Sequence, residues 1–168
     1  SISGSELVIN SSSGVLTFKT APDYETKTSY SATVTASDGK NSTTQSITVN
    51  VTDVNEAPAF TSNAAFSAAE NQTTIGTVTA SDVDGDTITY SISGSDIMIN
   101  SSSGVIAFAS APDYETKTSY TATVTASDGT NSTTQDITVN VTNVNDVAPE
   151  FTSEATFSVA ENQTAIGC

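Results

Sequence analysis

The amino-acid sequence predicts an all-β protein built from tandem β-sandwiches. Ser and Thr make up a third of the 168 residues, and stretches rich in Ala, Leu, Glu and Lys, which favour helices, are absent. Apolar and polar residues alternate with a period of two, which is typical of strands that bury one face. A unit of about 90 residues also recurs along the chain.

The repeat divides the chain into three parts. Residues 111–120 repeat residues 21–30 without a change, at an offset of 90, and after residue 147 the offset becomes 91. The expected domains are a partial repeat at residues 1–57, a complete repeat at residues 58–148 and the first strand of a third repeat at residues 149–168. The partial repeat lacks the first two strands. We therefore expect head-to-tail association or disorder at both ends, while residues 58–148 fold independently.

Seven short strands are expected in the complete repeat, separated by turns at residues 84–86, 102–104 and 128–129. The expected strands are residues 59–68, 75–81, 88–93, 97–99, 105–109, 120–126 and 135–144. In the last two, apolar side chains at alternate positions would face the core, and Thr and Asn would face solvent. Seven strands in this length predict a seven-stranded Greek-key sandwich of the immunoglobulin-like type.

The charge balance excludes several classes of function. The chain has 19 Asp and Glu against 4 Lys, no Arg and no His, and a formal net charge of -15. It therefore has no basic face for nucleic acid, and an anionic membrane surface would repel it. Without His there is no Ser-His or Cys-His nucleophile, and the single Cys168 excludes a zinc site built on several Cys. No apolar run approaches the roughly 20 residues of a membrane-spanning helix, so the protein is not expected to be membrane-embedded.

Acidic residues gather where the turns of the sandwich meet. Successive antiparallel strands run in opposite directions, so every second turn lies at the same end of the sandwich. One end of the complete repeat would carry Asp82, Asp84, Asp86 and Asp128, and the other Glu70, Asp113 and Glu115. Such carboxylates repel one another unless a cation lies among them, and oxygen ligands without His or Cys suit calcium. An acidic surface that merely maintains solubility is the alternative, but it would not require clustering.

Four motifs of the chain resemble those of cadherin repeats, specifically of the bacterial cadherin-like type. The segments are Ala69-Glu70-Asn71, similar to Pro-Glu-Asn; Asp82-Val83-Asp84, similar to Asp-Ala-Asp; Asp113-Tyr114-Glu115, similar to Asp-Arg-Glu; and residues 145–151, similar to the linker Asp-x-Asn-Asp-x-x-Pro-x-Phe. The resemblance implies a cadherin-like sandwich that binds Ca²⁺ between consecutive repeats.

The resemblance also implies which residues bind calcium. At the junction near residue 55 the implied ligands are Asp23, Glu25, Asp53, Asn55, Glu56, Asp82, Asp84 and Asp128. At the second junction they are Glu70, Asp113, Glu115, Asn145 and Asp146. Glu56 and Asn143 stand where the family has Asp, so the number of ions at each junction stays open.

The function that the resemblance implies is a calcium-stiffened structural or adhesive module of a large bacterial surface or secreted adhesin. Its first partners would be adjacent repeats of the same chain, with homophilic or polysaccharide contact as further expected partners. A calcium-dependent carbohydrate-binding module is the alternative, but it needs an exposed aromatic strip, and the sequence shows none. Paired carboxylates also occur in glycosidases, but a chain without Trp has poor means to grip sugar, so no enzymatic activity is expected.

Overall fold

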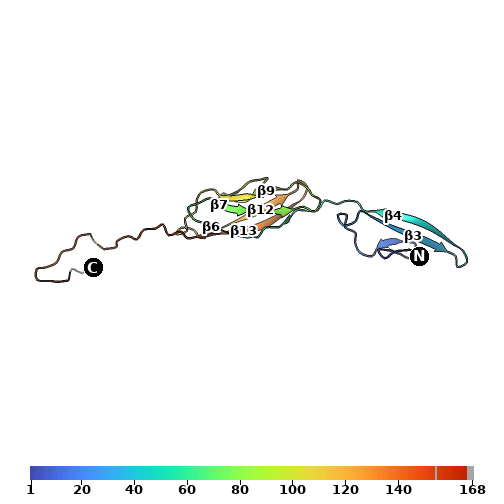
Figure 1. Cartoon of the computed structure of the whole chain (residues 1–168), viewed down its shortest axis with the longest axis horizontal. Coiled ribbons are helices and arrows are strands. Elements are labelled where there is room, and N and C mark those ends of the chain that lie inside the picture. The colour runs from blue at the N-terminus through green and yellow to red at the C-terminus, as the bar shows by residue number, and fades with distance from the viewer. Residues whose placement is uncertain (154, 166–168) are drawn as a thin grey trace.

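The computed structural model describes residues 1–153 and 155–165, and two repeats lie end to end in it (Figure 1). The regular elements of the described residues are all β-strands, which confirms the predicted fold class. In these residues no helix is long and apolar enough to span a membrane. An extended linker, residues 51–58, joins the two repeats.

The complete repeat is a sandwich of two main sheets. One sheet has the order β6-β13-β12-β9, with β6 parallel to β13 and the other pairs antiparallel; the second has the order β10-β11-β7. A short pair, β5-β8, extends the sandwich towards the linker. The strands are β5 (Ala59–Phe60), β6 (Ala65–Ala69), β7 (Thr74–Thr77), β8 (Ala80–Ser81), β9 (Thr89–Ile92), β10 (Ile97–Ile99), β11 (Val105–Phe108), β12 (Ser119–Ser127) and β13 (Ser132–Thr142).

Two of the seven predicted strands are each divided in the structure. Residues 59–68 form β5 and β6 because the chain changes partner, from β8 to β13, around Ser62. The amides of Thr61 and Ser62 both donate to Thr79 O at 2.8 and 3.2 Å, which holds the chain at the point of crossing. The second predicted strand, residues 75–81, likewise becomes β7 and β8. The chain therefore switches sheets inside what its sequence presents as one strand.

The core lies between the two main sheets. Val124 of β12 and Ile137 and Val139 of β13 are buried from one side, and Ile106 and Phe108 of β11 from the other. The alternation predicted for these strands is confirmed, since every second residue points inward. Burying each such side chain contributes about 1.5–3 kcal/mol, so this core is the main source of stability of the repeat.

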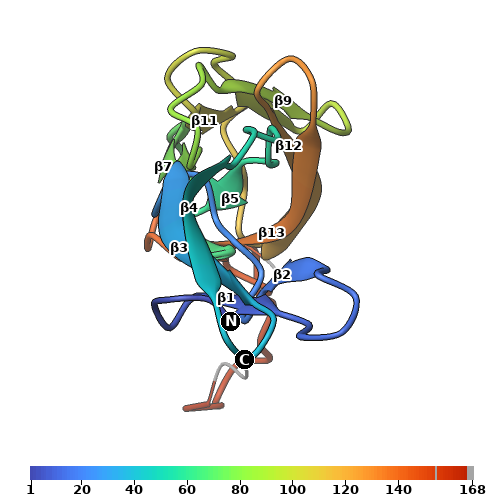
Figure 2. The ribbon, with the colours of Figure 1, turned by 90° about the vertical axis from the view of Figure 1, so that its right-hand side faces the viewer.

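The first repeat consists of two hairpins. These are β1 (Leu7–Ile9) with β2 (Leu16–Phe18), and β3 (Ser29–Ser37) with β4 (Ser42–Asn50). Tyr30 pairs with Val49 as Tyr120 pairs with Val139, so the long hairpins share one register at an offset of 90. Figure 2 looks along the rod and shows this hairpin in front of the complete repeat.

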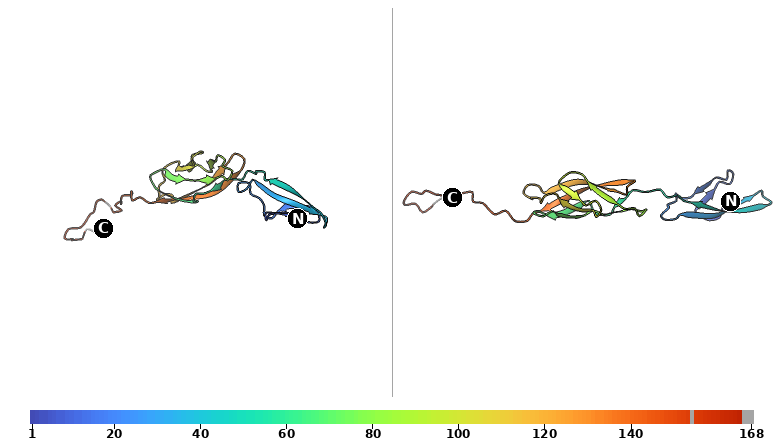
Figure 3. Two further views of the ribbon diagram at one scale, coloured as in Figure 1. Left: turned by 45° about the vertical axis from the view of Figure 1, so that its right-hand side comes forward. Right: turned by 90° about the horizontal axis from the view of Figure 1, so that it is seen from above.

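In the described part of the tail that follows the complete repeat, the strand predicted at residues 149–168 is absent. Residues 149–153 and 155–165 contain no strand, and Phe151 is 97% exposed. This tail runs away from the complete repeat in both views of Figure 3. A strand needs a partner for its amides and carbonyls, and the described tail holds no second strand to pair with. Residues 154 and 166–168 lie outside the described residues.

Candidate metal centre

Four carboxylates converge at the junction between the two repeats. Glu25 comes from the loop between β2 and β3, Asp53 and Glu56 from the linker, and Asp84 from the loop between β8 and β9. Each offers an oxygen, and these four oxygens all lie within 4.8 Å of one another. Residues from both repeats and from the linker thus share one site, and we call these four residues the first cluster.

The loop that carries Asp84 is shaped by the preceding acid. Asp82 Oδ1 accepts hydrogen bonds from the amides of Asp84, at 3.0 Å, and Asp86, at 3.3 Å. The other oxygen, Asp82 Oδ2, and Asp84 Oδ1 are buried and have no hydrogen-bond partner among the described residues. A buried carboxylate oxygen without a partner raises the free energy of the folded state, and a bound cation would remove this cost at each of the two oxygens.

The linker is hydrogen-bonded to the second repeat beside the first cluster. Glu56 N donates to Asp84 Oδ2 at 2.9 Å, and Asn55 Nδ2 donates to Asp128 Oδ2 at 2.9 Å. Asn131 Nδ2 in turn donates to Asn55 O at 2.7 Å. These three bonds set the direction in which the linker enters the second repeat. Sequence reasoning missed Asn131; its recurrence at Asn41, in the matching turn of the first repeat, was the available signal.

Two of the predicted ligands lie outside the first cluster and shape their own turns instead. Asp128 Oδ1 accepts hydrogen bonds from the amides of Thr130 and Asn131, both at 2.6 Å. Asp23 Oδ1 accepts one from Thr26 N at 3.1 Å, which lowers the pKa of Asp23. Desolvation opposes a similar effect at Asp128, but the hydrogen bonds it accepts outweigh that cost and lower its pKa. Asp82 is also outside the cluster, but it accepts a hydrogen bond from Asp84 N, and Asn55 Nδ2 donates to Glu56 O, so both contact members of the cluster.

Mutual repulsion marks the electrostatics of the first cluster. The backbone amide of Glu25 stabilises its own carboxylate, but desolvation and repulsion from neighbouring carboxylates outweigh this and raise the pKa of Glu25. These neighbours are Glu56, Asp53 and Asp84. Desolvation, followed by repulsion from Asp84 and Asp53, also raises the pKa of Glu56. A cation placed among these groups would relieve the repulsion.

A second cluster lies at the opposite end of the complete repeat. Oxygens of Glu70, Glu115 and Asp146 lie within 4.8 Å of one another. Glu70 is only 3% exposed, and its carboxylate accepts hydrogen bonds from Tyr114 N at 2.8 Å and Val144 N at 2.7 Å. This buried carboxylate therefore ties the loop before β12 to the segment that leaves β13.

Side-chain amides contact the second cluster. Asn143 Nδ2 donates to Glu115 Oε1 at 2.8 Å, and Asn71 Nδ2 donates to Asp146 Oδ2. The motif Ala69-Glu70-Asn71 contains Asn71, but sequence reasoning did not assign it to the site; its positive φ of 64° marks it as the residue that turns the chain after β6. The predicted ligand Asp113 is not a member of this cluster of carboxylates. Asn145 is exposed, and its role as a ligand stays a prediction. Side-chain amides thus stabilise two acids of the second cluster by hydrogen bonds, whereas in the first cluster a backbone amide, Glu56 N, donates to Asp84.

The chemistry of the first cluster fits calcium. The donors are carboxylate oxygens, with no nitrogen or sulfur ligand, and Ca²⁺ takes six to eight oxygen ligands in flexible geometry. Within the cluster, Asp84 Oδ1 is buried and has no hydrogen-bond partner among the described residues, and Asp82 Oδ2 in the same loop shares this state. The same donor set is unsuited to zinc, which favours His and Cys.

Comparisons with known proteins agree with this architecture. The family model described as "Cadherin domain" matches residues 64–142. The Drosophila melanogaster protocadherin-like wing polarity protein stan is 35% identical over 161 residues, which covers 83% of this chain and 4% of that protein. Cadherin-7 of Gallus gallus is 32% identical over 173 residues, or 89% of this chain and 22% of that protein. The chain thus spans a small part of the length of these relatives.

Solved structures show the same likeness. The structure titled protocadherin gamma B2 extracellular cadherin domains 3–6 has a TM-score of 0.63 and 31% identity, and covers 86% of this chain and 41% of its own. The protocadherin gammaB7 EC3-6 cis-dimer structure has a TM-score of 0.60 and 32% identity, with 87% and 42% covered. Residues 64–142 therefore match a cadherin domain, and the comparisons support cadherin repeats in this chain.

Proposed function

We propose that this chain is a structural and adhesive segment in which Ca²⁺, bound between consecutive repeats, holds the repeats in a stiff rod. Cadherin domains are calcium-dependent adhesion modules that occur in tandem. The observation that carries the proposal for this chain is the first cluster, because its four carboxylates come from two repeats and the linker. An ion bound there would connect both repeats and the linker, and would add to the hydrogen bonds that already tie the linker to the second repeat.

The mechanism follows from the charges. Without a cation, Glu25 on one side of the junction repels Asp84 on the other, which favours arrangements that move the repeats apart. A divalent ion turns this repulsion into shared coordination, so the junction gains a preferred geometry. Glu25, Asp53, Glu56 and Asp84 would supply the first ligands, with Asp82 at the edge of the site.

The wider setting is proposed from the resemblance and the relatives. The named structures are of extracellular cadherin domains, so we place this chain outside the cell. From the sequence motifs alone, we extend the proposal to a large bacterial surface or secreted adhesin, with homophilic contact as a further possibility. The relatives with a stated source come from animals, and they support the repeat type rather than this setting.

We do not extend the proposal to carbohydrate binding. Stacking on sugar needs a free face of an aromatic ring. The rings of the two matching tyrosines, Tyr30 and Tyr120, are already in contact with other side chains. The ammonium of Lys27 lies 4.4 Å from the ring centroid of Tyr30, and that of Lys117 lies 4.0 Å from the centroid of Tyr120. Phe18 and Phe108 pack edge-on against these same rings.

Isothermal titration calorimetry with CaCl₂ tests the proposal. The expected affinity is about 10⁻⁵ to 10⁻³ M, in the range of sensors and extracellular modules. Binding heat that a chelator abolishes, together with a raised melting temperature, would support calcium binding. The absence of both at millimolar calcium would contradict it. Magnesium serves as the matched control, because it demands a more rigid octahedral site.

A further inference from the structure

Two of the four lysines occupy equivalent positions in the two repeats and make the same ion pair. Lys27 Nζ lies 2.8 and 2.6 Å from the two carboxylate oxygens of Glu6, and Lys117 Nζ lies 2.9 Å from Asp96 Oδ2. The acid differs between the repeats, yet the pair is retained. In a chain with 19 acids and four lysines, this recurrence sets the two lysines apart from general charge balance.

The same ammonium groups also lie over aromatic rings. Lys27 Nζ is 4.4 Å from the ring centroid of Tyr30, and Lys117 Nζ is 4.0 Å from that of Tyr120. Each Tyr is the second residue of a long strand, β3 or β12, whereas each acid stands just before a short strand, β1 or β10. Each lysine side chain therefore joins the two sheets of its repeat by contacting one residue at the edge of each.

The backbone of each lysine closes the turn that carries predicted calcium ligands. Lys27 N donates to Asp23 O at 2.9 Å, and Lys117 N donates to Asp113 O at the same distance. Glu25, a member of the first cluster, lies inside the first of these turns. The side chain of Lys27 thus anchors the end of a turn, and that turn presents Glu25 to the junction.

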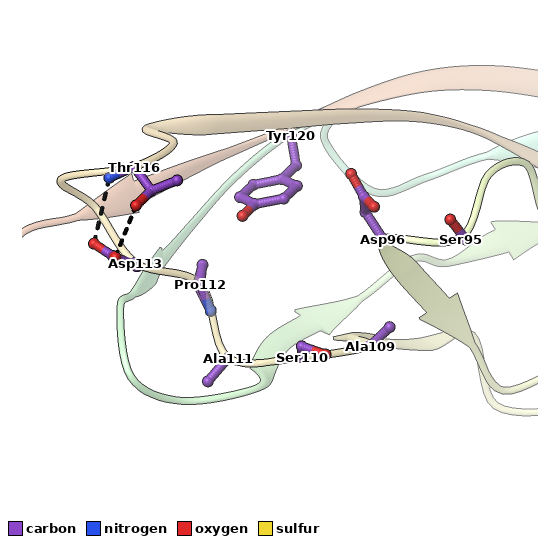
Figure 4. Close-up of a pocket in the computed structure, with 9 residues that line it drawn as sticks. All are labelled: Ser95, Asp96, Ala109, Ser110, Ala111, Pro112, Asp113, Thr116 and Tyr120. Carbon is purple, nitrogen blue, oxygen red and sulfur yellow. Dashed lines mark hydrogen bonds between the residues drawn. The ribbon is translucent and has the colours of Figure 1, made fainter.

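The surroundings of the second lysine show how this anchor works. Figure 4 shows Tyr120 facing the segment that leads to Asp113 across a hollow of about 370 Å³, with Asp96 at the other end. An equivalent hollow of about 340 Å³ lies beside Tyr30 in the first repeat. Tyr114 packs the middle of this loop against the core, whereas Asp113 and Thr116 line the hollow, so apolar packing does not reach the whole loop. The lysine contacts are among the interactions that remain to hold its position.

We propose that Lys27 and Lys117 are positioning residues, which hold the ligand-bearing turns in the geometry that calcium requires. The inference rests on the proposed calcium function. Two physical effects of these lysines on calcium affinity have opposite signs. The positive charge of a lysine near the site repels Ca²⁺, so through charge alone the loss of the lysine would tighten calcium binding. Through positioning, its removal weakens binding because the turn must be ordered when the ion arrives.

The test compares Lys27→Met with the unaltered chain, using the amide NMR signals of Glu25 and Glu56 to follow calcium at the first junction. We expect Lys27→Met to weaken binding there by about two- to tenfold, in keeping with an exposed ion pair plus a cation–π contact. Lys27→Arg, which keeps both contacts, should restore most of the affinity. Unchanged or tighter binding in Lys27→Met would overturn the proposal.

Two controls carry the same loss of charge. Lys40→Met removes a lysine in the turn after β3, and Lys117→Met removes the matching lysine of the other repeat. Neither should weaken binding at the first junction, and an equal loss in either would overturn the proposal.

Hydrogen exchange measured without calcium separates the positioning role of Lys27 from the proposed calcium function. In Lys27→Met the amides of Thr26 and Lys27 should exchange hydrogen faster than in the unaltered chain, and unchanged exchange would contradict the positioning role. If the unaltered chain itself shows no calcium-dependent shift at Glu25 and Glu56, the proposed calcium function fails, and the exchange data still decide whether Lys27 anchors the turn.

Discussion

Replacing Asp84 by Asn should reduce the stabilisation that calcium confers while leaving the loop in place. Asp84 belongs to the first cluster, and its Oδ2 accepts a hydrogen bond from Glu56 N at 2.9 Å. The carbonyl oxygen of an amide can accept the same bond. The variant Asp84→Asn therefore removes one of four negative charges from the cluster and keeps the contact with the linker.

The size of the effect follows from linkage between binding and folding. With a Kd of about 0.1 mM, typical of weak extracellular modules, 10 mM calcium stabilises the folded state by about 2.7 kcal/mol. Changes around metal ligands commonly weaken affinity by about 10- to 100-fold. A tenfold loss would leave about 1.4 kcal/mol, which lowers the calcium-induced rise in Tm by roughly 5–10 °C for a repeat of this size.

Thermal unfolding followed by circular dichroism, with and without 10 mM calcium, measures this difference. The matched control is Asp136→Asn, because Asp136 lies on β13, away from both clusters, and accepts a hydrogen bond from Thr123 Oγ1 at 2.6 Å. Its calcium response should equal that of the unaltered chain. Without calcium, Asp84→Asn should be at least as stable as the unaltered chain, since it removes repulsion. Equal calcium responses in the two variants would refute the reasoning.

Two further predictions concern pH and a glycine. The pKa values of Glu25 and Glu56 are raised above the ordinary value of 4.5. On acidification the folded state therefore binds protons at these two carboxylates at a higher pH than the unfolded state does. As pH falls from 7 towards 4.5, the calcium-free protein should gain stability while calcium affinity falls, measured by thermal unfolding and calorimetry; a calcium affinity independent of pH would contradict this. Gly104→Ala should destabilise by about 2–5 kcal/mol in urea unfolding, because its φ is +69° and a Cβ would lie 2.1 Å from Val78 O. Gly14→Ala, with a similar φ and open space, should cost only about 1–2 kcal/mol, and equal costs would show that the contact with Val78 is unimportant.

The fold was predictable from the sequence where one face of a strand is buried. In β12 and β13 the alternation of apolar residues with Thr locates each strand and its inward face, because a shift of one residue would expose every core side chain. The division of residues 59–68 was not predictable in this way. It depends on which neighbouring strand accepts each amide, and local alternation carries no information about that choice.

The candidate site was predictable as a region but not atom by atom. The positions of the turns place acids at the ends of each repeat, and the family motifs name the residues. Neither indicates that Asp128 binds its own turn and Asn55, while Asp84 keeps a buried oxygen without a partner. The contacts of Asn131 and Asn71 depend on the three-dimensional path of each junction, so side-chain amides of this kind escape sequence reasoning.

Small-angle X-ray scattering, with calcium and with a chelator, tests the central claim most directly. The account predicts that calcium narrows the distribution of shapes to an extended rod, with the repeats end to end as in Figure 1, and that the chelator gives a broader distribution with a shorter mean length. Asp84→Asn should need more calcium to reach the narrow state. Identical scattering profiles in both solutions, under conditions where calorimetry shows calcium bound, would contradict the claim that the ion stiffens the junction.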